Sequence, residues 1–267
     1  MRNGVTRRDW LRLVGTLAIL SGCAGRSSWV PVRPDPDADT GNVGEANLAK
    51  APHRPSRYVV AADPLVIHSD CEISSEAPMI REARSLQFGL TAAGLPVPEE
   101  PVHIYLFDSE PEFLVYAMFR IPGFTDRRAF FVQTPERLEV YAFVSDELPV
   151  DLRHEVTHGY LHAANPGIAL WLDEGLAEYA EVPANQRGRH PEHEQTLRRL
   201  TSEPLQWMSE TELEREIAVL ARMNEPATMT ALDYARCWRV VRQLFQTESG
   251  RQKLRELLRP ENQKSEK

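Results

Sequence analysis

The chain has 267 residues, 42% hydrophobic and 26% charged, which is enough for one fair-sized domain or two small ones. Its formal net charge is −8 and it contains no basic tract, so we expect no nucleic-acid partner. The acidic balance otherwise indicates only that the protein stays in solution.

The first 22 residues are typical of an export signal rather than of a folded segment. Arg7 and Arg8 precede an apolar stretch, 11–20, that is too short to span a bilayer as a helix. This start resembles a twin-arginine export signal, and Leu20-Ser21-Gly22-Cys23 resembles the lipobox of bacterial lipoproteins. The lipobox resemblance implies cleavage before Cys23 and a diacylglycerol on its thiol. The alternative is a plain signal peptide with a chance cysteine.

A lipid on Cys23 would anchor the exported protein to a membrane through its buried methylenes. Ala24 follows, where an aspartate would mark retention at the inner membrane, so we expect the protein at the outer membrane, facing the periplasm. Residues 23–56 are rich in proline, aspartate, glycine and alanine, which predicts a flexible tether. The folded domain is expected at 57–260 and a frayed tail at 261–267.

Two cysteines remain after processing, Cys71 and Cys237. An exported protein meets an oxidising compartment, so a disulfide between them is one expectation. Two free thiols are the alternative, because cysteine is often simply buried and a disulfide needs closely approaching Cα atoms.

The first half of the domain combines strand and helix patterns. β-branched, aromatic or alternating residues predict strands at 58–62, 65–68, 102–107, 129–133 and 138–144. Helical spacing of apolar residues predicts helices at 77–93, ending at Gly94, and at 110–119. Ordinary sheet packing is the default for 129–133; the further hypothesis is an edge strand that pairs with an extended substrate.

From residue 146 onward the pattern is almost wholly helical. Apolar spacing predicts helices at 148–164, 170–181, 190–201, 209–223, 230–247 and 250–258. Strands first and helices later indicate the α+β class. We therefore expect a small mixed or antiparallel N-terminal sheet with helices, followed by a mainly helical half.

The residues best suited to chemistry are His154-Glu155-Val156-Thr157-His158, an HExxH motif. Two histidines four residues apart lie one turn apart on one helix face, so both imidazoles can meet one Zn²⁺. Glu155 projects beside them and can hold the water that the metal polarises. Pro149 near the start and Asn165-Pro166-Gly167 after the end favour a helix. Chance copies of this motif usually lie on a solvated helix face.

The segment Trp171-Leu172-Asp173-Glu174-Gly175-Leu176-Ala177-Glu178-Tyr179 predicts an antiparallel second helix whose start faces the first. A catalytic zinc needs three protein ligands and one open position, and Glu174 is the right kind of third ligand. Glu178, one turn further, is expected to accept the N–H of a ligand histidine, with Glu181 as the weaker candidate. Trp171 and Leu172 are expected in the core.

The pair HEVTH and WLDEGLAEY resembles the gluzincin metallopeptidases, most of all the bacterial peptidase MA-like families, firmly over 140–182 and loosely through 234–238. The resemblance implies a zincin-like fold, zinc bound by His154, His158 and Glu174, and Glu155 as general base. Some gluzincins place a tyrosine downstream that steadies the oxyanion, which implies that role for Tyr234. The alternative is a core tyrosine beside Trp238.

The remaining histidines match no ligand pattern. A metzincin would need glycine at 161 and histidine at 164, where this chain has leucine and alanine. His162 is expected at the surface or a cleft edge. His190 and His193 are expected in a solvated loop or helix start, and His53, His68 and His103 have no partners at ligand spacing.

We therefore expect a zinc-dependent hydrolase of peptide bonds, acting on a peptide or protein and held to a membrane through Cys23. One alternative is a zinc amidase that acts on cell-wall peptides. Another is a lipoprotein that binds metal without catalysis, because a fold does not fix a function. The sequence carries no signal for cleavage specificity or oligomeric state.

Overall fold

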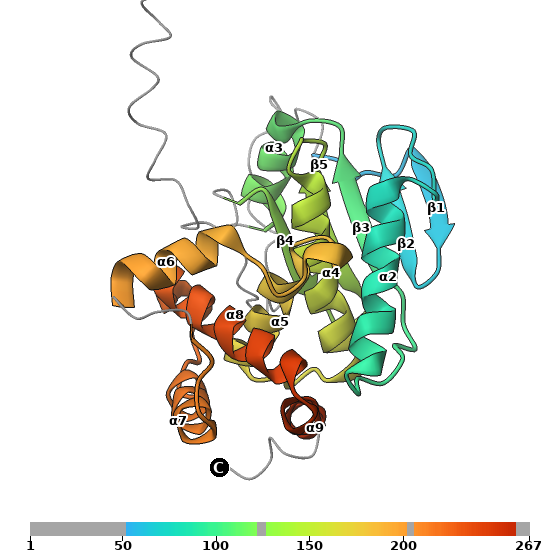
Figure 1. Cartoon of the computed structure of the whole chain (residues 1–267). Coiled ribbons are helices and arrows are strands. Elements are labelled where there is room, and N and C mark those ends of the chain that lie inside the picture. The colour runs from blue at the N-terminus through green and yellow to red at the C-terminus, as the bar shows by residue number, and fades with distance from the viewer. Residues whose placement is uncertain (1–51, 122–126, 202–205, 260–267) are drawn as a thin grey trace, which may run out of the picture.

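The computed structural model describes residues 52–121, 127–201 and 206–259 (Figure 1). The predicted export signal, Cys23, nearly all of the predicted tether and the predicted tail lie outside the described residues. Within the described part, no helix combines the length and the apolar character needed to cross a membrane.

The folded part begins a few residues before the predicted boundary at 57. Pro55 is buried, and Arg54 donates to the Glu139 carboxylate at 2.9 Å while its guanidinium lies 4.3 Å from the centre of the Tyr105 ring. His53 lies 3.1 Å from Asp70. The last predicted tether residues therefore pack on the domain.

Five strands form one mixed sheet in the order β1-β2-β3-β5-β4. The outer pairs, β1–β2 and β4–β5, are antiparallel, whereas β2–β3 and β3–β5 are parallel. β4 is an edge strand, which agrees with the hypothesis for 129–133. The strand bounds are Tyr58–Ala62 for β1, Leu65–Ser69 for β2, Val102–Phe107 for β3, Ala129–Gln133 for β4 and Leu138–Phe143 for β5.

Eight α-helices lie within the described residues, six of them after the last strand. This arrangement confirms the α+β class with an N-terminal sheet. The helix bounds agree closely with the predicted ranges: α2 Pro78–Ala92, α3 Glu110–Arg120, α4 Leu148–Ala164, α5 Leu170–Ala180, α6 Pro191–Thr201, α7 Glu210–Leu220, α8 Ala231–Gln246 and α9 Glu248–Leu257.

Helices cover both faces of the sheet (Figure 1). Successive side chains of a strand point to opposite faces. On β3, Ile104 and Leu106 join the main core with α2, α4 and α5, while Tyr105 and Phe107 join a second, aromatic core under α3. Two-sided burial explains why β3 and β5 are almost continuously apolar.

The HExxH helix α4 lies against the sheet, and α5 packs between α4 and α8. Gly159 of α4 allows the close approach, because a Cβ there would lie 2.8 Å from the Val102 side chain of β3. Gly175 of α5 does the same for α8, because its Cβ would lie 2.8 Å from the Cys237 carbonyl oxygen. Both glycines thus set the position of the two motif helices.

Cys71 and Cys237 are free thiols. The expected disulfide is therefore wrong, and the alternative of two free thiols is confirmed. Cys71 is partly exposed just after β2, a strand of the sheet. Cys237 is buried in the helical half, against Gly175 of α5. The two thiols belong to different layers of the fold, which a sequence pattern does not reveal.

Candidate metal centre

His154 and His158 of α4 and Glu174 of α5 bring three metal-binding atoms together. The two Nε2 atoms are 3.1 Å apart, and each lies 3.8 Å from Oε2 of Glu174. In a tetrahedral zinc site, neighbouring ligand atoms are about 3.4 Å apart. The three distances bracket that value, so the group could hold one metal ion.

The chemistry of Glu174 also fits a cation. The side chains of His154, His158 and Glu174 are 4%, 0% and 0% exposed. Both carboxylate oxygens of Glu174 are buried and have no hydrogen-bond partner among the described residues. A buried carboxylate without partners costs several kcal/mol, roughly, in ordinary packing. Bound metal would supply the missing interaction.

The same packing shifts the protonation of all three groups. Burial raises the pKa of Glu174 to about 8, against the opposing charges of His158 and His154. Burial lowers the pKa of His154, but the hydrogen bond and charge of Glu181 outweigh it, so the net pKa is raised. Burial also lowers the pKa of His158, but the charge and hydrogen bond of Asp173 outweigh it, so the net pKa is raised. Without a metal, protons therefore compensate charge in this cluster.

Carboxylates outside the ligand group orient both imidazoles. Nδ1 of His154 lies 2.9 Å from Oε1 of Glu181, and Nδ1 of His158 lies 2.8 Å from Oδ1 of Asp173. Each contact turns Nε2 toward the centre and favours the tautomer that keeps a lone pair there.

The predicted orienting role of Glu178 is wrong, and the weaker candidate, Glu181, fills it. Glu181 caps the C-terminus of α5, two turns beyond Glu174, and from there its side chain reaches His154. Glu178 instead accepts from Nε2 of His193 at 2.6 Å. Asp173 was not predicted as an orienting residue, although its position directly beside Glu174 in the sequence was a usable signal.

The prediction that His162 lies at the surface or at a cleft edge is also wrong. His162 is 2% exposed, and its Nε2 lies 3.0 Å from Oδ2 of Asp173. Burial raises the pKa of Asp173, but the neighbouring His158 and His162 outweigh it and hold the pKa well below its usual range. Edge strand β4 buries His162, because the Phe131 ring lies 5.3 Å from the imidazole.

Glu155 and Tyr234 both lie close to the metal-binding group. Glu155 is buried, and its charge helps to raise the pKa of His154. Tyr234 is buried on α8, and burial together with the charges of Glu174 and Glu178 raises the pKa of its hydroxyl. The Tyr234 hydroxyl is therefore within electrostatic range of the Glu174 and Glu178 carboxylates.

His190 and His193 are not solvated, contrary to the prediction. They are 5% and 1% exposed, their rings stack with centroids 3.9 Å apart, and His193 packs beside Trp238 of α8. Nε2 of His190 lies 3.1 Å from Oε2 of Glu181. Both histidines contact carboxylates at the end of α5: His193 contacts Glu178, and His190 contacts Glu181. Trp171 and Leu172, by contrast, lie in the core as predicted.

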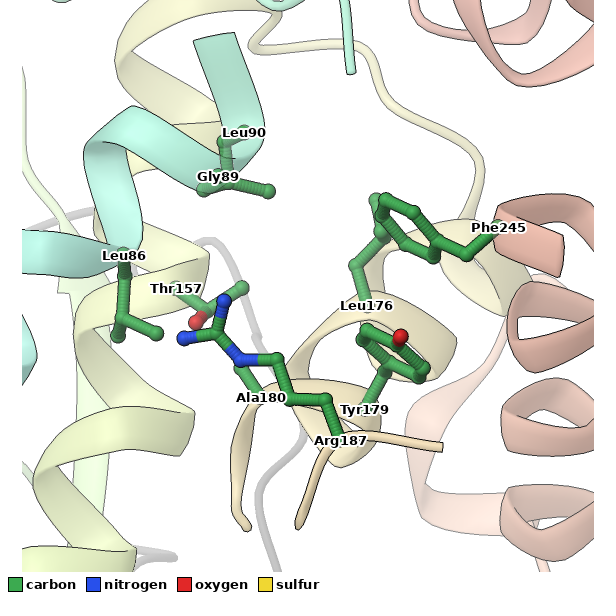
Figure 2. A pocket seen from close by; sticks show the side chains of 9 residues that line it. All are labelled: Leu86, Gly89, Leu90, Thr157, Leu176, Tyr179, Ala180, Arg187 and Phe245. Atoms are coloured by element: carbon green, nitrogen blue, oxygen red, sulfur yellow. The ribbon is translucent and has the colours of Figure 1, made fainter. Parts of the chain in front are cut away.

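A separate pocket lies among α2, α4, α5 and α8 (Figure 2). Its volume is about 130 Å³, and its lining is largely apolar, with polar groups from Thr157, Tyr179 and Arg187. Thr157 of α4 lines it, whereas His154, His158 and Glu174 do not. The pocket is therefore distinct from the metal-binding group.

Comparisons with protein-family models, with curated proteins and with solved structures gave no match for this chain. The inference of function consequently rests on the side chains of the buried cluster.

Proposed function

We propose that this chain is a zinc-dependent hydrolase of peptide bonds. The supporting observation is the convergence of His154, His158 and Glu174 from two adjacent helices, with both Glu174 oxygens lacking hydrogen bonds among the described residues. Two imidazoles and one carboxylate, with a fourth position left open, suit catalytic zinc. The likeness of HEVTH and WLDEGLAEY to gluzincin motifs agrees with this assignment.

The protein groups would divide the work of hydrolysis. Bound zinc would lower the pKa of a water molecule and polarise the scissile carbonyl. Glu155 takes the proton of the attacking water and later passes it to the leaving amine. Glu181 and Asp173 keep the imidazoles oriented throughout. The Tyr234 hydroxyl, whose pKa the charge of Glu174 helps to raise, would donate to the carbonyl oxygen as negative charge develops on it.

An extended substrate would align along β4. This strand forms one edge of the sheet and lies beside α4. A peptide added at that edge would gain main-chain hydrogen bonds and run past the helix that carries His154 and His158.

Glu155→Gln tests the proposal. Because glutamine cannot accept the water's proton, peptide hydrolysis is expected to fall by about 10²- to 10⁴-fold or more while zinc stays bound. The measurements are zinc content and cleavage of a mixed peptide library by the full-length protein. Glu147→Gln, at the exposed N-terminus of α4, is the matched control and should leave both unchanged. Undiminished hydrolysis in zinc-loaded Glu155→Gln would refute the mechanism.

A metal-holding protein without catalysis is the second candidate, favoured by the burial of all three ligand side chains. It predicts one tightly bound zinc and no cleavage of any peptide. Cell-wall peptides included in the same library test the amidase alternative. Cleavage confined to those fragments would favour an amidase over a general peptidase.

A further inference from the structure

A second buried group of metal-binding side chains lies next to the first. It consists of Glu178 on α5, His190 just before α6 and His193 on α6, whose ligand atoms all lie within 4.8 Å of one another. The side chains are 1%, 6% and 1% exposed. Two imidazoles and one carboxylate are the same donor set as in the first group.

Two carboxylates, Glu181 and Glu178, lie close to donor atoms of both groups. Glu181 contacts Nδ1 of His154 through Oε1 and Nε2 of His190 through Oε2. An oxygen of Glu178 also lies within 4.8 Å of donor atoms of His154 and Glu181. A charge in either group therefore interacts strongly with charges in the other group, because the two groups are in contact.

The buried carboxyl groups of this region outnumber its buried cationic side chains. Among the described residues, α4, α5 and Glu181 contribute five buried carboxyl groups: Glu155, Asp173, Glu174, Glu178 and Glu181. They contribute one buried guanidinium, Arg153. With every carboxylate ionised, Arg153 and one divalent ion leave two negative charges. Either a second divalent ion or two protons, on imidazoles or on carboxyl groups, must balance them, because unpaired buried charge is very costly.

We propose that Glu178, His190 and His193 form a second binding site for a divalent metal ion. The donor set suits Zn²⁺ and related ions of intermediate softness, such as Co²⁺. The 2.6 Å contact of His193 with Glu178 and the 4.0 Å separation of His190 from the same oxygen need only small side-chain shifts to place all three atoms around one ion. The site needs no catalytic activity, so it stands or falls separately from peptide hydrolysis.

Metal stoichiometry of the full-length protein tests the second site. We expect two Zn²⁺ per chain after loading and desalting, measured by elemental mass spectrometry. His193→Gln should lose one ion and keep the other at the first group, and Glu174→Gln should lose the first ion and keep the second. The double variant should bind none. His53→Gln, an exposed histidine, is the matched control and should keep both ions.

One Zn²⁺ in the wild-type protein, or two ions that persist in His193→Gln, would overturn the proposal; the first result would assign the balancing charges to protons. If His193→Gln does not fold, Co²⁺ titration of the wild-type protein decides instead, because two sites give an absorption change that saturates at two equivalents rather than one. A protein that holds two ions yet cleaves no peptide would contradict the proposed function and leave the second site standing.

Discussion

At the scale of single residues, the centre depends on carboxylates that do not ligate. Asp173 and Glu181 hold the Nδ1 atoms of the two histidines, and Asp173 is shared with His162. Such partners fix ring orientation and raise ligand basicity. The orientation of both imidazoles is therefore set by α5 and its C-terminal cap.

Glu181→Gln should weaken zinc binding by about 10- to 100-fold, because an amide no longer offers His154 a charged acceptor. Competition with a chromophoric chelator measures the affinity. Glu136→Gln, in the exposed turn between β4 and β5, controls for the substitution itself. An unchanged affinity would mean that Glu181 does not orient His154. Because Glu181 also contacts His190, the affinity that is compared should be that of the ion held by His154, His158 and Glu174.

The pKa shifts predict opposite pH trends with and without metal. The pKa of Glu174 is raised to about 8 and that of His154 to about 10, so both groups favour their protonated forms in the fold. Such groups contribute stability at low pH and lose it as pH rises toward the folded pKa. The metal-free melting temperature should therefore fall from pH 7 to pH 9.

Zinc binding should become stronger as pH rises, because the ligands must release protons before the ion can bind. The increase in melting temperature caused by zinc should grow over the same pH range. Thermal unfolding with chelator and with zinc, at three pH values, measures both trends. Metal-free Glu174→Gln should show a shallower fall. A metal-free melting temperature that rises with pH would show that the shifts have the wrong sign.

At the scale of elements, two glycines allow the motif helices to approach their neighbours. Gly159 brings α4 onto β3, and Gly175 brings α5 onto α8, which carries Tyr234. Helix propensity alone would favour alanine at both positions. Their presence is explained by close packing of α4 on β3 and of α5 on α8.

Gly175→Ala should destabilise the protein by about 1–3 kcal/mol, because the new methyl group would meet the backbone carbonyl of Cys237 at 2.8 Å. Urea unfolding measures the change. Gly89→Ala in α2 is the matched control, since its nearest neighbour is the end of the Arg187 side chain, at 3.2 Å. That control should be neutral or stabilising by up to about 1 kcal/mol. Equal effects of the two substitutions would argue against the packing role.

At the scale of the whole molecule, one mixed sheet supports a mainly helical half, and the site lies where the two meet. α4 contacts both β4 and β5 of the sheet and α5 of the helical half. α6 then folds back on α8 and brings His193 to Glu178. The proposed export and lipid anchor belong to this scale too, because they would decide where the domain acts.

Cys23→Ser should release the protein from the membrane fraction, because the lipid is attached through the cysteine thiol. Cell fractionation and intact-mass measurement of the purified protein test this. The wild-type protein should start at Cys23 and carry the mass of a diacylglycerol. Cys71→Ser, a cysteine within the folded domain, should stay with the membrane. A wild-type protein without added lipid mass would contradict the anchor.

The sequence by itself determined the elements and the principal group of side chains that could hold a metal ion. Period-2 and period-3.6 patterns place nearly every strand and helix, because burial on one face imposes those spacings. His154 and His158 are one turn apart on α4, so their proximity follows from local geometry. Glu174 needed only the expectation that the next helix runs back beside the first.

Only the tertiary structure decided which side chains surround those ligands. His162, His190 and His193 look solvated in sequence because their neighbours are polar, yet Phe131 and Trp238 from distant elements bury them. The choice of Glu181 over Glu178 depends on how α5 ends and where α6 packs. Such contacts join residues brought together by the packing of separate elements, and no spacing along the chain encodes them.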